Sequence, residues 1–191
     1  MHSPFSNSNF RRIAGLAPLL LIAIFALSLV GCNKDIETIE AKEGGRIKLD
    51  NLFYQVQLSR MLNPKDTEDR YYLLDQPTPA KGEAYFGVFM RVDNEDNPTR
   101  LMPIGIKNMK IKNASDDVFT PIPVKGAGWA YEPVPLGKGA FLPVQDTPAG
   151  IGPIRGGLIL FKIPYDGLDS RPLKLYIKSP SGKIGQITLD V

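Results

Sequence analysis

The chain has 191 residues, of which 43% are apolar, 9% aromatic and 23% charged, a composition typical of one folded domain and not of a disordered chain. Its formal net charge is +3, with Lys+Arg 23 against Asp+Glu 20. The single Cys excludes an intrachain disulfide, and the single His lies at position 2, in the first few residues. Most classes of enzyme are therefore disfavoured at the outset.

Residues 1–31 have the layout of a secretory signal peptide. The first 12 residues are polar and carry Arg11 and Arg12 without an acid, and residues 13–30 are then almost entirely apolar. An uncleaved transmembrane anchor is the alternative, because 18 apolar residues lie at the short end of what spans a bilayer. The charged-then-apolar order favours a signal helix that is removed.

The end of the apolar stretch separates these two alternatives. The motif Leu29-Val30-Gly31-Cys32 resembles the lipobox of bacterial lipoproteins. This resemblance implies cleavage before Cys32 and a covalent lipid on it, with a diacylglycerol on the sulfur and usually an acyl chain such as palmitate on the amine. Two or three such chains hold a protein stably at a membrane, since each buried CH₂ contributes roughly 0.8 kcal/mol.

Loss of the signal peptide changes the charge balance and the expected partners. Arg11 and Arg12 leave with residues 1–31, which gives Lys+Arg 21 against Asp+Glu 20 in the mature chain. A near-neutral domain gives no electrostatic reason to expect nucleic acid or strong attraction to anionic lipid. We expect a location in the bacterial cell envelope, on the periplasmic side or the cell surface. The resemblance to bacterial lipoproteins implies that an Asp directly after the acylated Cys would retain the protein at the inner membrane of a Gram-negative organism. Asn33 stands at this position and therefore favours the outer membrane, if the organism has one.

A flexible tether is predicted over residues 32–45, after the acylated Cys. This segment is polar, mixes acids and bases, and ends in Gly44-Gly45. Its r.m.s. reach would be about 20 Å. A short helix over residues 35–43 is the alternative, although Ile36 and Ile39 alone would give it little to bury.

From residue 46 the hydrophobic pattern has a period of two, which predicts β-strands. Residues 84–93 have apolar side chains at both even and odd positions, which point to opposite faces of a strand. This pattern indicates a central strand covered on both sides. Residues 106–124 and 173–191 are predicted hairpins, and residues 157–163 a buried strand. Within residues 46–58, four side chains are expected on one face of a half-buried strand: Leu52, Tyr54, Val56 and Leu58.

Seven or eight short strands without a convincing helical period predict an all-β fold, a single antiparallel β-sandwich over residues 46–191. The strong strand entering residues 91–94, the turn at 114–117 and the Gly-led strand 155–164 resemble an immunoglobulin-like domain family of unknown function in secreted bacterial lipoproteins. The resemblance implies an immunoglobulin-like sandwich and supplies no catalytic residue. A long Pro/Gly insertion before residue 157 departs from the family pattern.

The residue inventory of the mature chain disfavours catalysis. With His2 removed and Cys32 acylated, Ser-His-Asp and Cys-His arrangements and ordinary zinc sites cannot be built. No glycine motif for phosphates or dinucleotides occurs. A hydrolase with two carboxylates across a cleft is the remaining enzymatic alternative. We expect a non-enzymatic protein, without a cofactor, that binds or scaffolds an envelope protein or glycan.

One candidate site is the acidic turn at residues 93–97. Asp93, Glu95 and Asp96 could offer oxygens to Ca²⁺, which would make the domain an ion- or small-ligand-binding module. The simpler interpretation is a polar hairpin turn, since Asp and Asn favour such turns.

A second candidate is the long segment 121–157, which holds 7 prolines and 8 glycines in 37 residues. Trp129 and Tyr131 could present an aromatic pair to a glycan, peptide or partner protein. The alternative is that Trp129 fills the sandwich core.

Lys107, Lys110 and Lys112, together with Lys125, could form a patch for anions. Lys110 and Lys112 alternate with Met109 and Ile111, a pattern that predicts the solvated face of an edge strand. No binding site is predicted there.

Overall fold

The structure is a computed structural model that describes residues 36–125 and 128–191. The chain divides into two units, residues 1–35 and 36–191. The predicted signal peptide, the lipobox and Cys32 lie outside the described residues. Within the described ranges, no helix has the length and apolar character needed to cross a bilayer.

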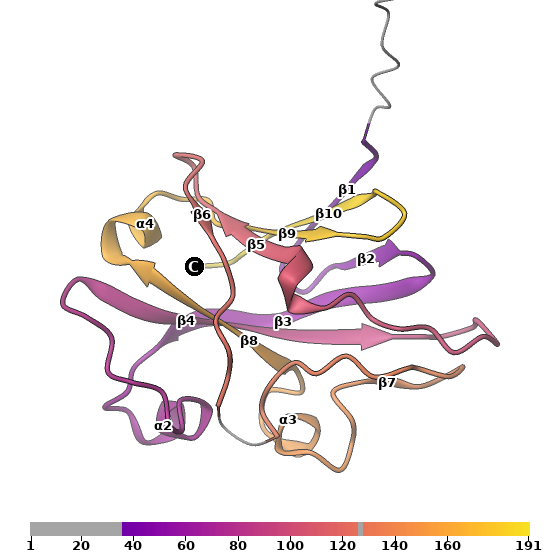
Figure 1. The fold of residues 1–191 in the computed structure, drawn as a ribbon, viewed down its shortest axis with the longest axis horizontal. Helices are drawn as coiled ribbons and strands as arrows, with labels where there is room; N and C mark the ends of the chain where they lie inside the picture. The colour runs from indigo at the N-terminus through magenta and orange to yellow at the C-terminus, as the bar shows by residue number, and fades with distance from the viewer. Residues whose placement is uncertain (1–35, 126–127) are drawn as a thin grey trace, which may run out of the picture. The chain divides into compact units, whose positions relative to one another are not determined.

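The described part of the chain folds into ten strands joined by turns and a few short helices (Figure 1). The strands are β1 (Thr38–Lys42), β2 (Arg46–Leu49), β3 (Leu52–Leu62), β4 (Glu83–Asp93), β5 (Met109–Lys112), β6 (Val118–Phe119), β7 (Phe141–Leu142), β8 (Gly157–Pro164), β9 (Lys174–Lys178) and β10 (Ile184–Thr188). The helical segments are α2 (Thr67–Tyr72), the 3₁₀ turn η2 (Ile106–Asn108), α3 (Pro148–Ile151) and α4 (Tyr165–Asp169).

Two sheets lie on each other as a sandwich, which confirms the predicted all-β fold (Figure 1). Sheet A has the order β1-β10-β9-β5-β6. In sheet B, β2-β3-β4 continue into both β7 and β8, which pair with different lengths of β4. The pairs are antiparallel apart from β1 with β10, which is parallel.

Residues 38–45 differ from the flexible tether that was predicted. β1 pairs with β10 from Thr38 opposite Ile184 to Lys42 opposite Thr188. The Glu43 carboxylate then links the two sheets. It accepts a hydrogen bond from the N–H of Ser59 in β3 at 2.8 Å and another from the N–H of Asp190, just after β10, at 3.0 Å. The local composition of this segment is polar, but pairing with a strand nearly 150 residues away orders it.

The predicted single strand over residues 46–58 is instead a hairpin. Asp50 and Asn51 both have positive φ, 47° and 68°, and form the two-residue turn between β2 and β3. Asn and Asp adopt this left-handed backbone more readily than other non-glycine residues. The first half of the predicted strand therefore pairs with the second.

The expectation for Leu58 was wrong. Leu52, Tyr54 and Val56 face the interior between the sheets, as predicted. The register of β3 against β4 shifts between Val56 and Leu58, so Leu58 points to the outer side of sheet B. A β-bulge adds one residue and so reverses the alternation of side chains beyond it.

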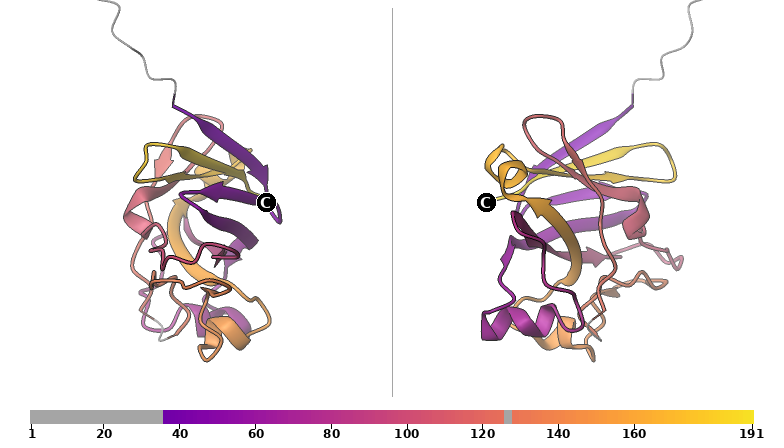
Figure 2. Two further views of the ribbon diagram at one scale, coloured as in Figure 1. Left: turned by 90° about the vertical axis from the view of Figure 1, so that its right-hand side faces the viewer. Right: turned by 60° about the vertical axis from the view of Figure 1, so that its left-hand side comes forward.

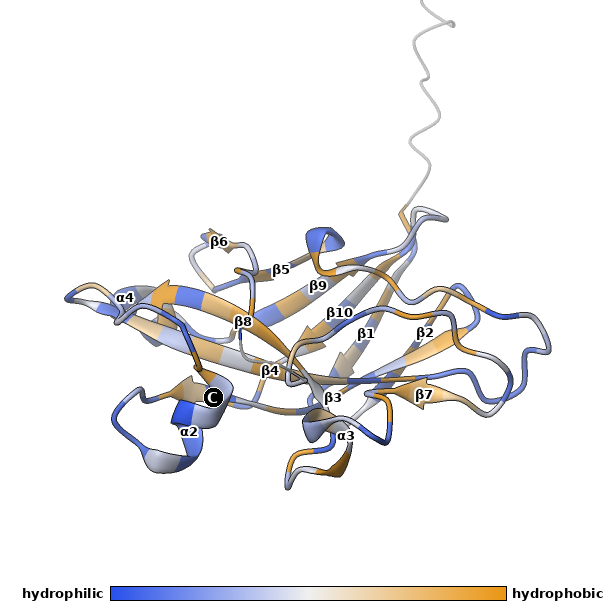
Figure 3. Cartoon of the chain, turned by 60° about the horizontal axis from the view of Figure 1, so that its bottom comes forward, coloured by the Kyte–Doolittle hydropathy of each residue, from blue (hydrophilic) through white to orange (hydrophobic). Residues whose placement is uncertain are grey.

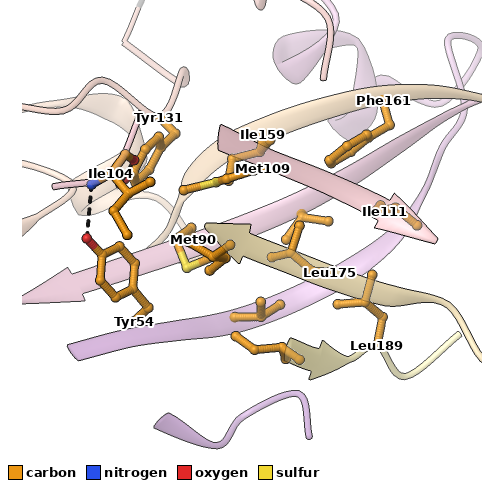
Figure 4. Packing of buried hydrophobic residues seen from close by; sticks show 14 of the residues in the cluster. Tyr54, Met90, Ile104, Met109, Ile111, Tyr131, Ile159, Phe161, Leu175 and Leu189 are labelled. Carbon is orange, nitrogen blue, oxygen red and sulfur yellow. Dashed lines mark hydrogen bonds between the residues drawn. The ribbon is translucent and has the colours of Figure 1, made fainter. Parts of the chain in front are cut away.

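The main core lies between the two sheets (Figure 4). Tyr54 and Tyr131 hold the Ile104 backbone there from two directions. The Tyr54 hydroxyl accepts from the Ile104 N–H at 2.9 Å, and the Tyr131 hydroxyl donates to the Ile104 carbonyl at 2.9 Å. Burial raises the pKa of Tyr54 to about 12 and also raises the pKa of Tyr131.

A second apolar cluster covers the outer side of sheet B. Tyr85 and Phe89 of β4 and Leu160 of β8 are buried there, beneath Tyr72 of α2. In both views of Figure 2, α2 and α3 lie on the side of sheet B away from sheet A. β4 is thus buried on both faces, which confirms the prediction of a central strand at 84–93.

Candidate functional site

The acidic turn after β4 is organised by the buried side chain of Asn94. Its amide nitrogen donates to the carbonyls of Leu136 at 2.9 Å and of Asn97 and Thr99 at 3.2 Å. Its oxygen accepts from the Asn97 N–H at 3.1 Å. The amide between the acids, and not the acids themselves, therefore shapes this turn.

Two of the three predicted Ca²⁺ ligands are paired with arginines. The Asp93 carboxylate lies 2.7 Å from the Arg91 guanidinium, and the Glu95 carboxylate lies 2.6 Å from the Arg46 guanidinium. Asp96 is exposed. Within the residues that the structure describes, no group of three or more His, Cys, Asp or Glu side chains could hold a metal ion. Ca²⁺ binding at this turn stays a prediction.

The predicted aromatic pair does not form one exposed surface. Tyr131 is only 5% exposed. Its N–H donates a hydrogen bond to the Leu158 carbonyl at 2.9 Å, which holds the chain around Tyr131 against β8. Its side chain is a core residue, because its hydroxyl finds a buried partner in the Ile104 carbonyl.

Trp129 is half-buried in the second cluster. Its ring packs edge-on against Tyr72, with 4.7 Å between ring centroids. Of the two alternatives for Trp129, burial is closer to what the structure shows, but under α2 and outside the core between the sheets. The sequence could not distinguish these places, since both require a large apolar side chain.

The outward positions of β5 and β9 carry a row of lysines, of which Lys110 and Lys112 were predicted to be the solvated face of an edge strand. The register places Lys110 opposite Tyr176 and Lys112 opposite Lys174. The residues between them point inward and are buried, so hydrophilic and hydrophobic residues alternate along both strands (Figure 3). We call this outward surface the lysine face and define it as Tyr176 with Lys107, Lys110, Lys112, Lys174 and Lys178.

The lysine face contains a depression of about 370 Å³ that is open to solvent. Tyr176 lies among its lining residues, and the Lys112 ammonium sits 5.7 Å from the centre of the Tyr176 ring. The remaining lysines of the lining come from three places, the 3₁₀ turn η2, β5 and the end of β9. Residues far apart in sequence therefore converge on one depression: Lys107, Lys110, Lys112 and Lys178.

In the described part of the chain, most of these ammonium groups have no acid within ion-pair distance. Lys112 pairs with Asp116 at 3.3 Å, and the Asp116 side chain is 86% exposed. Among residues 36–125 and 128–191, no carboxylate lies within 4.0 Å of the ammonium groups of Lys107, Lys110 or Lys178. The hollow is therefore suited to phosphate, sulfate or carboxylate groups, which ammonium groups bind as point charges.

The prediction of a solvated edge strand missed this site for two reasons. β5 is not an edge, because β6 pairs with one side of it and β9 with the other. A near-neutral net charge also says nothing about how charges are distributed over the surface. A possible signal was a second strand with alternating lysines at residues 174–178, where Lys174, Tyr176 and Lys178 fall on one face.

Comparisons with known proteins identify the fold. No family model matches the chain, and no curated protein matches its sequence. The yjhA protein of Bacillus subtilis has a similar structure, with a TM-score of 0.54 at 12% identity over 78% of this chain and 99% of that one. The secreted protein MPT63 of Mycobacterium tuberculosis also has a similar structure, with a TM-score of 0.51 at 9% identity. The match covers 79% of this chain and 97% of MPT63.

A third similar structure is ycdA of Bacillus subtilis, named as a presumed lipoprotein, with a TM-score of 0.50 and 8% identity. The match covers 78% of this chain and 39% of ycdA, so the chain spans well under half of that protein's length. Identities this low show a shared fold alone. This β-sandwich is thus a fold found in a secreted protein and in a presumed lipoprotein.

Proposed function

We propose that this protein is a lipoprotein of the bacterial cell envelope, acylated at Cys32, whose domain binds an anionic envelope component through the lysine face. The lipobox motif at residues 29–32 supports the anchor. The similarity of the fold to a secreted protein and a presumed lipoprotein agrees with a location outside the cytoplasm.

The observation that carries the binding role is the hollow of the lysine face. Four lysines from three segments converge on it, and Tyr176 adds a flat ring with a hydroxyl group. Lysines scattered on a surface to aid solubility would be interspersed with acids. Here Asp116 is the acid within ion-pair distance of the lining lysines in the described part of the chain.

The same proposal assigns the domain no catalysis. The sole His and the sole Cys of the chain are His2 and Cys32, which the proposed processing removes or blocks. Binding by charge and shape requires neither residue type, whereas nucleophilic and zinc-dependent catalysis rely on them.

The anchor is tested by intact mass and membrane fractionation of the full chain made in a bacterial host. We expect loss of residues 1–31 and a lipid-sized mass gain, both absent in Cys32→Ala. An unmodified full-length wild-type chain in the membrane fraction would contradict acylation.

The binding role is tested separately by calorimetry with polyphosphate. We expect binding that weakens with added salt and is lost in the variant Lys110→Gln/Lys178→Gln. Equal binding by wild type and variant, or none by either, would show that the lysine face is not an anion site.

A further inference from the structure

The geometry points to a specific occupant for the lysine face: the anionic lipid headgroups of the membrane that holds the protein. This inference rests on the proposed acylation of Cys32. It names the anionic component as a lipid surface, which the domain touches directly instead of hanging away from it.

The chain enters the domain at the edge of the sheet that carries the lysine face. β1 is an edge strand of sheet A, the sheet that carries the lysine face. Thr38 at its start pairs with Ile184, and Ile184 pairs with Lys178. At about 4.8 Å per strand, Lys178 lies two strands, or about 10 Å, across the sheet from the point where the chain enters.

Lys107 and Lys110 follow in the same direction. Met109 opens β5 opposite Ile177, so η2 lies beside the same end of β9 as Lys178. In Figure 3, η2 and the β9–β10 turn lie at the end of sheet A where β1 begins. One more strand spacing places this part of the lysine face about 15 Å from Thr38.

The connection between Cys32 and Thr38 is short. Thr38 is the sixth residue after Cys32, and a fully extended chain spans at most about 3.6 Å per residue, or about 22 Å in total. Because β1 is part of sheet A, the connection from Cys32 ends at Thr38 and is shorter than a tether that ends at residue 45. An acylated Cys32 must keep Thr38 within that distance of the lipid surface, which is comparable to the distance of about 15 Å across sheet A from Thr38 to η2.

The charges on sheet A favour an anionic occupant. The lysine face carries five lysines, whereas the described strands of sheet A carry one acid, Glu40 of β1, which accepts a hydrogen bond from Gln186. Asp116, in the turn between β5 and β6, pairs with Lys112. Glu37, beside β1, pairs with Lys183. Each lysine near an anionic membrane strengthens binding by a factor of about 5, so a row of lysines is attracted strongly once the anchor holds it nearby.

The test measures binding of residues 33–191 without lipid to vesicles by sedimentation. In the described part of the chain, both hydrophobic clusters are built from residues 39–191, so we expect this part to fold by itself. We expect binding to vesicles of phosphatidylcholine with one third phosphatidylglycerol, little binding to phosphatidylcholine alone, and loss of binding at high salt.

Two double variants of equal charge separate the lysine face from net charge. Lys110→Gln/Lys178→Gln should lower the vesicle partition coefficient by about 25-fold, since each lysine near the surface accounts for a factor of about 5. Lys65→Gln/Lys81→Gln, on loops around sheet B, should lower it by less than about 3-fold, the effect of net charge alone. Unfolding by urea checks that both variants fold.

An equal loss in the two variants, or no binding to anionic vesicles, overturns the inference. Binding of polyphosphate without binding of vesicles would overturn the lipid surface as occupant while leaving the proposed anion site intact. The mass measurement on Cys32→Ala is independent of the lysines, so failure of the anchor is distinguished from failure of the lysine face.

Discussion

The outer sides of the two sheets are used in different ways. On sheet B, Tyr85 and Phe89 are buried under α2 and Trp129, whereas on sheet A, Lys110 and Tyr176 stand on an uncovered surface. The connections explain this difference. β5–β6 and β9–β10 are joined by tight turns, but the chain between β6 and β8 is long and passes over sheet B (Figure 2).

This comparison shows how strand composition reports the number of covered faces. β4 is buried at almost every position, while β9 alternates between buried leucine or isoleucine and exposed or half-buried polar residues. A side chain in a strand points to one face or the other, so apolar residues at both parities require a cover on both sides. The uncovered side is where a binding surface can lie.

The largest contrast between the two outer sides should appear in stability. Phe89→Ala removes a fully buried ring from the cluster on sheet B and should lower the free energy of unfolding by about 3–5 kcal/mol. Lys110→Ala on sheet A should change it by less than about 0.5 kcal/mol. Urea denaturation of both variants measures the difference, and similar values would contradict the assignment of covered and open faces.

A smaller contrast is expected between one ion pair on each side. Asp69 of α2 is buried, lies 2.5 Å from Arg60 and accepts from the Asn63 N–H at 2.8 Å. Asp69→Asn should cost about 2 kcal/mol, because the buried carboxylate loses its ion pair with Arg60.

Trp129 fluorescence reports on the same change. Loosening α2 should shift the Trp129 emission to the red and increase quenching, since Trp129 packs against Tyr72 of that helix. Asp116→Asn, which breaks the exposed pair with Lys112, is the matched control and should cost less than about 0.5 kcal/mol. Unchanged emission in Asp69→Asn would show that α2 is not held to sheet B by this pair.

The interior that the two sheets share should respond to alkaline pH. Because burial raises the pKa of Tyr54 from 10.0 to about 12, the folded state holds this proton more tightly than the unfolded state. Its contribution is complete below pH 10 and is lost as pH rises from 10 to about 12. At pH 11 the loss is about 1.4 kcal/mol, and Tyr131 acts in the same direction.

Tyr54→Phe isolates this effect. At neutral pH the variant should be less stable, because the Ile104 N–H loses its partner. The stability gap to wild type should narrow by about 1.4 kcal/mol between pH 9 and 11 in urea denaturation. A gap that stays constant with pH would contradict the shifted pKa of Tyr54.

The smallest effect is expected at the acidic turn that follows β4 in sheet B. Asp93 and Glu95 are already paired with arginines, so Ca²⁺ at millimolar concentration should raise the melting temperature by less than about 1 °C. A rise of several degrees that disappears in Asp93→Asn would instead show that Ca²⁺ competes successfully for these carboxylates.

Local pattern in the sequence was sufficient for much of the sandwich. Apolar residues at both odd and even positions of 84–93 predicted the central strand β4, and the patterns of residues 106–124 and 173–191 predicted two hairpins. These features depend on residues close together along the chain. For the same reason the motif ending in Cys32 could be interpreted without any structure.

The tertiary structure decided everything that depends on which strands become neighbours. The parallel partner of β1, the bulge that turns Leu58 outward and the burial of Tyr131 all require contacts across long separations. The lysine face is the functional example, because β5 and β9 bring Lys110 and Lys178 together only when they pair. Alternation within one strand determines which side chains share a face, but pairing between distant strands determines which faces join into one surface.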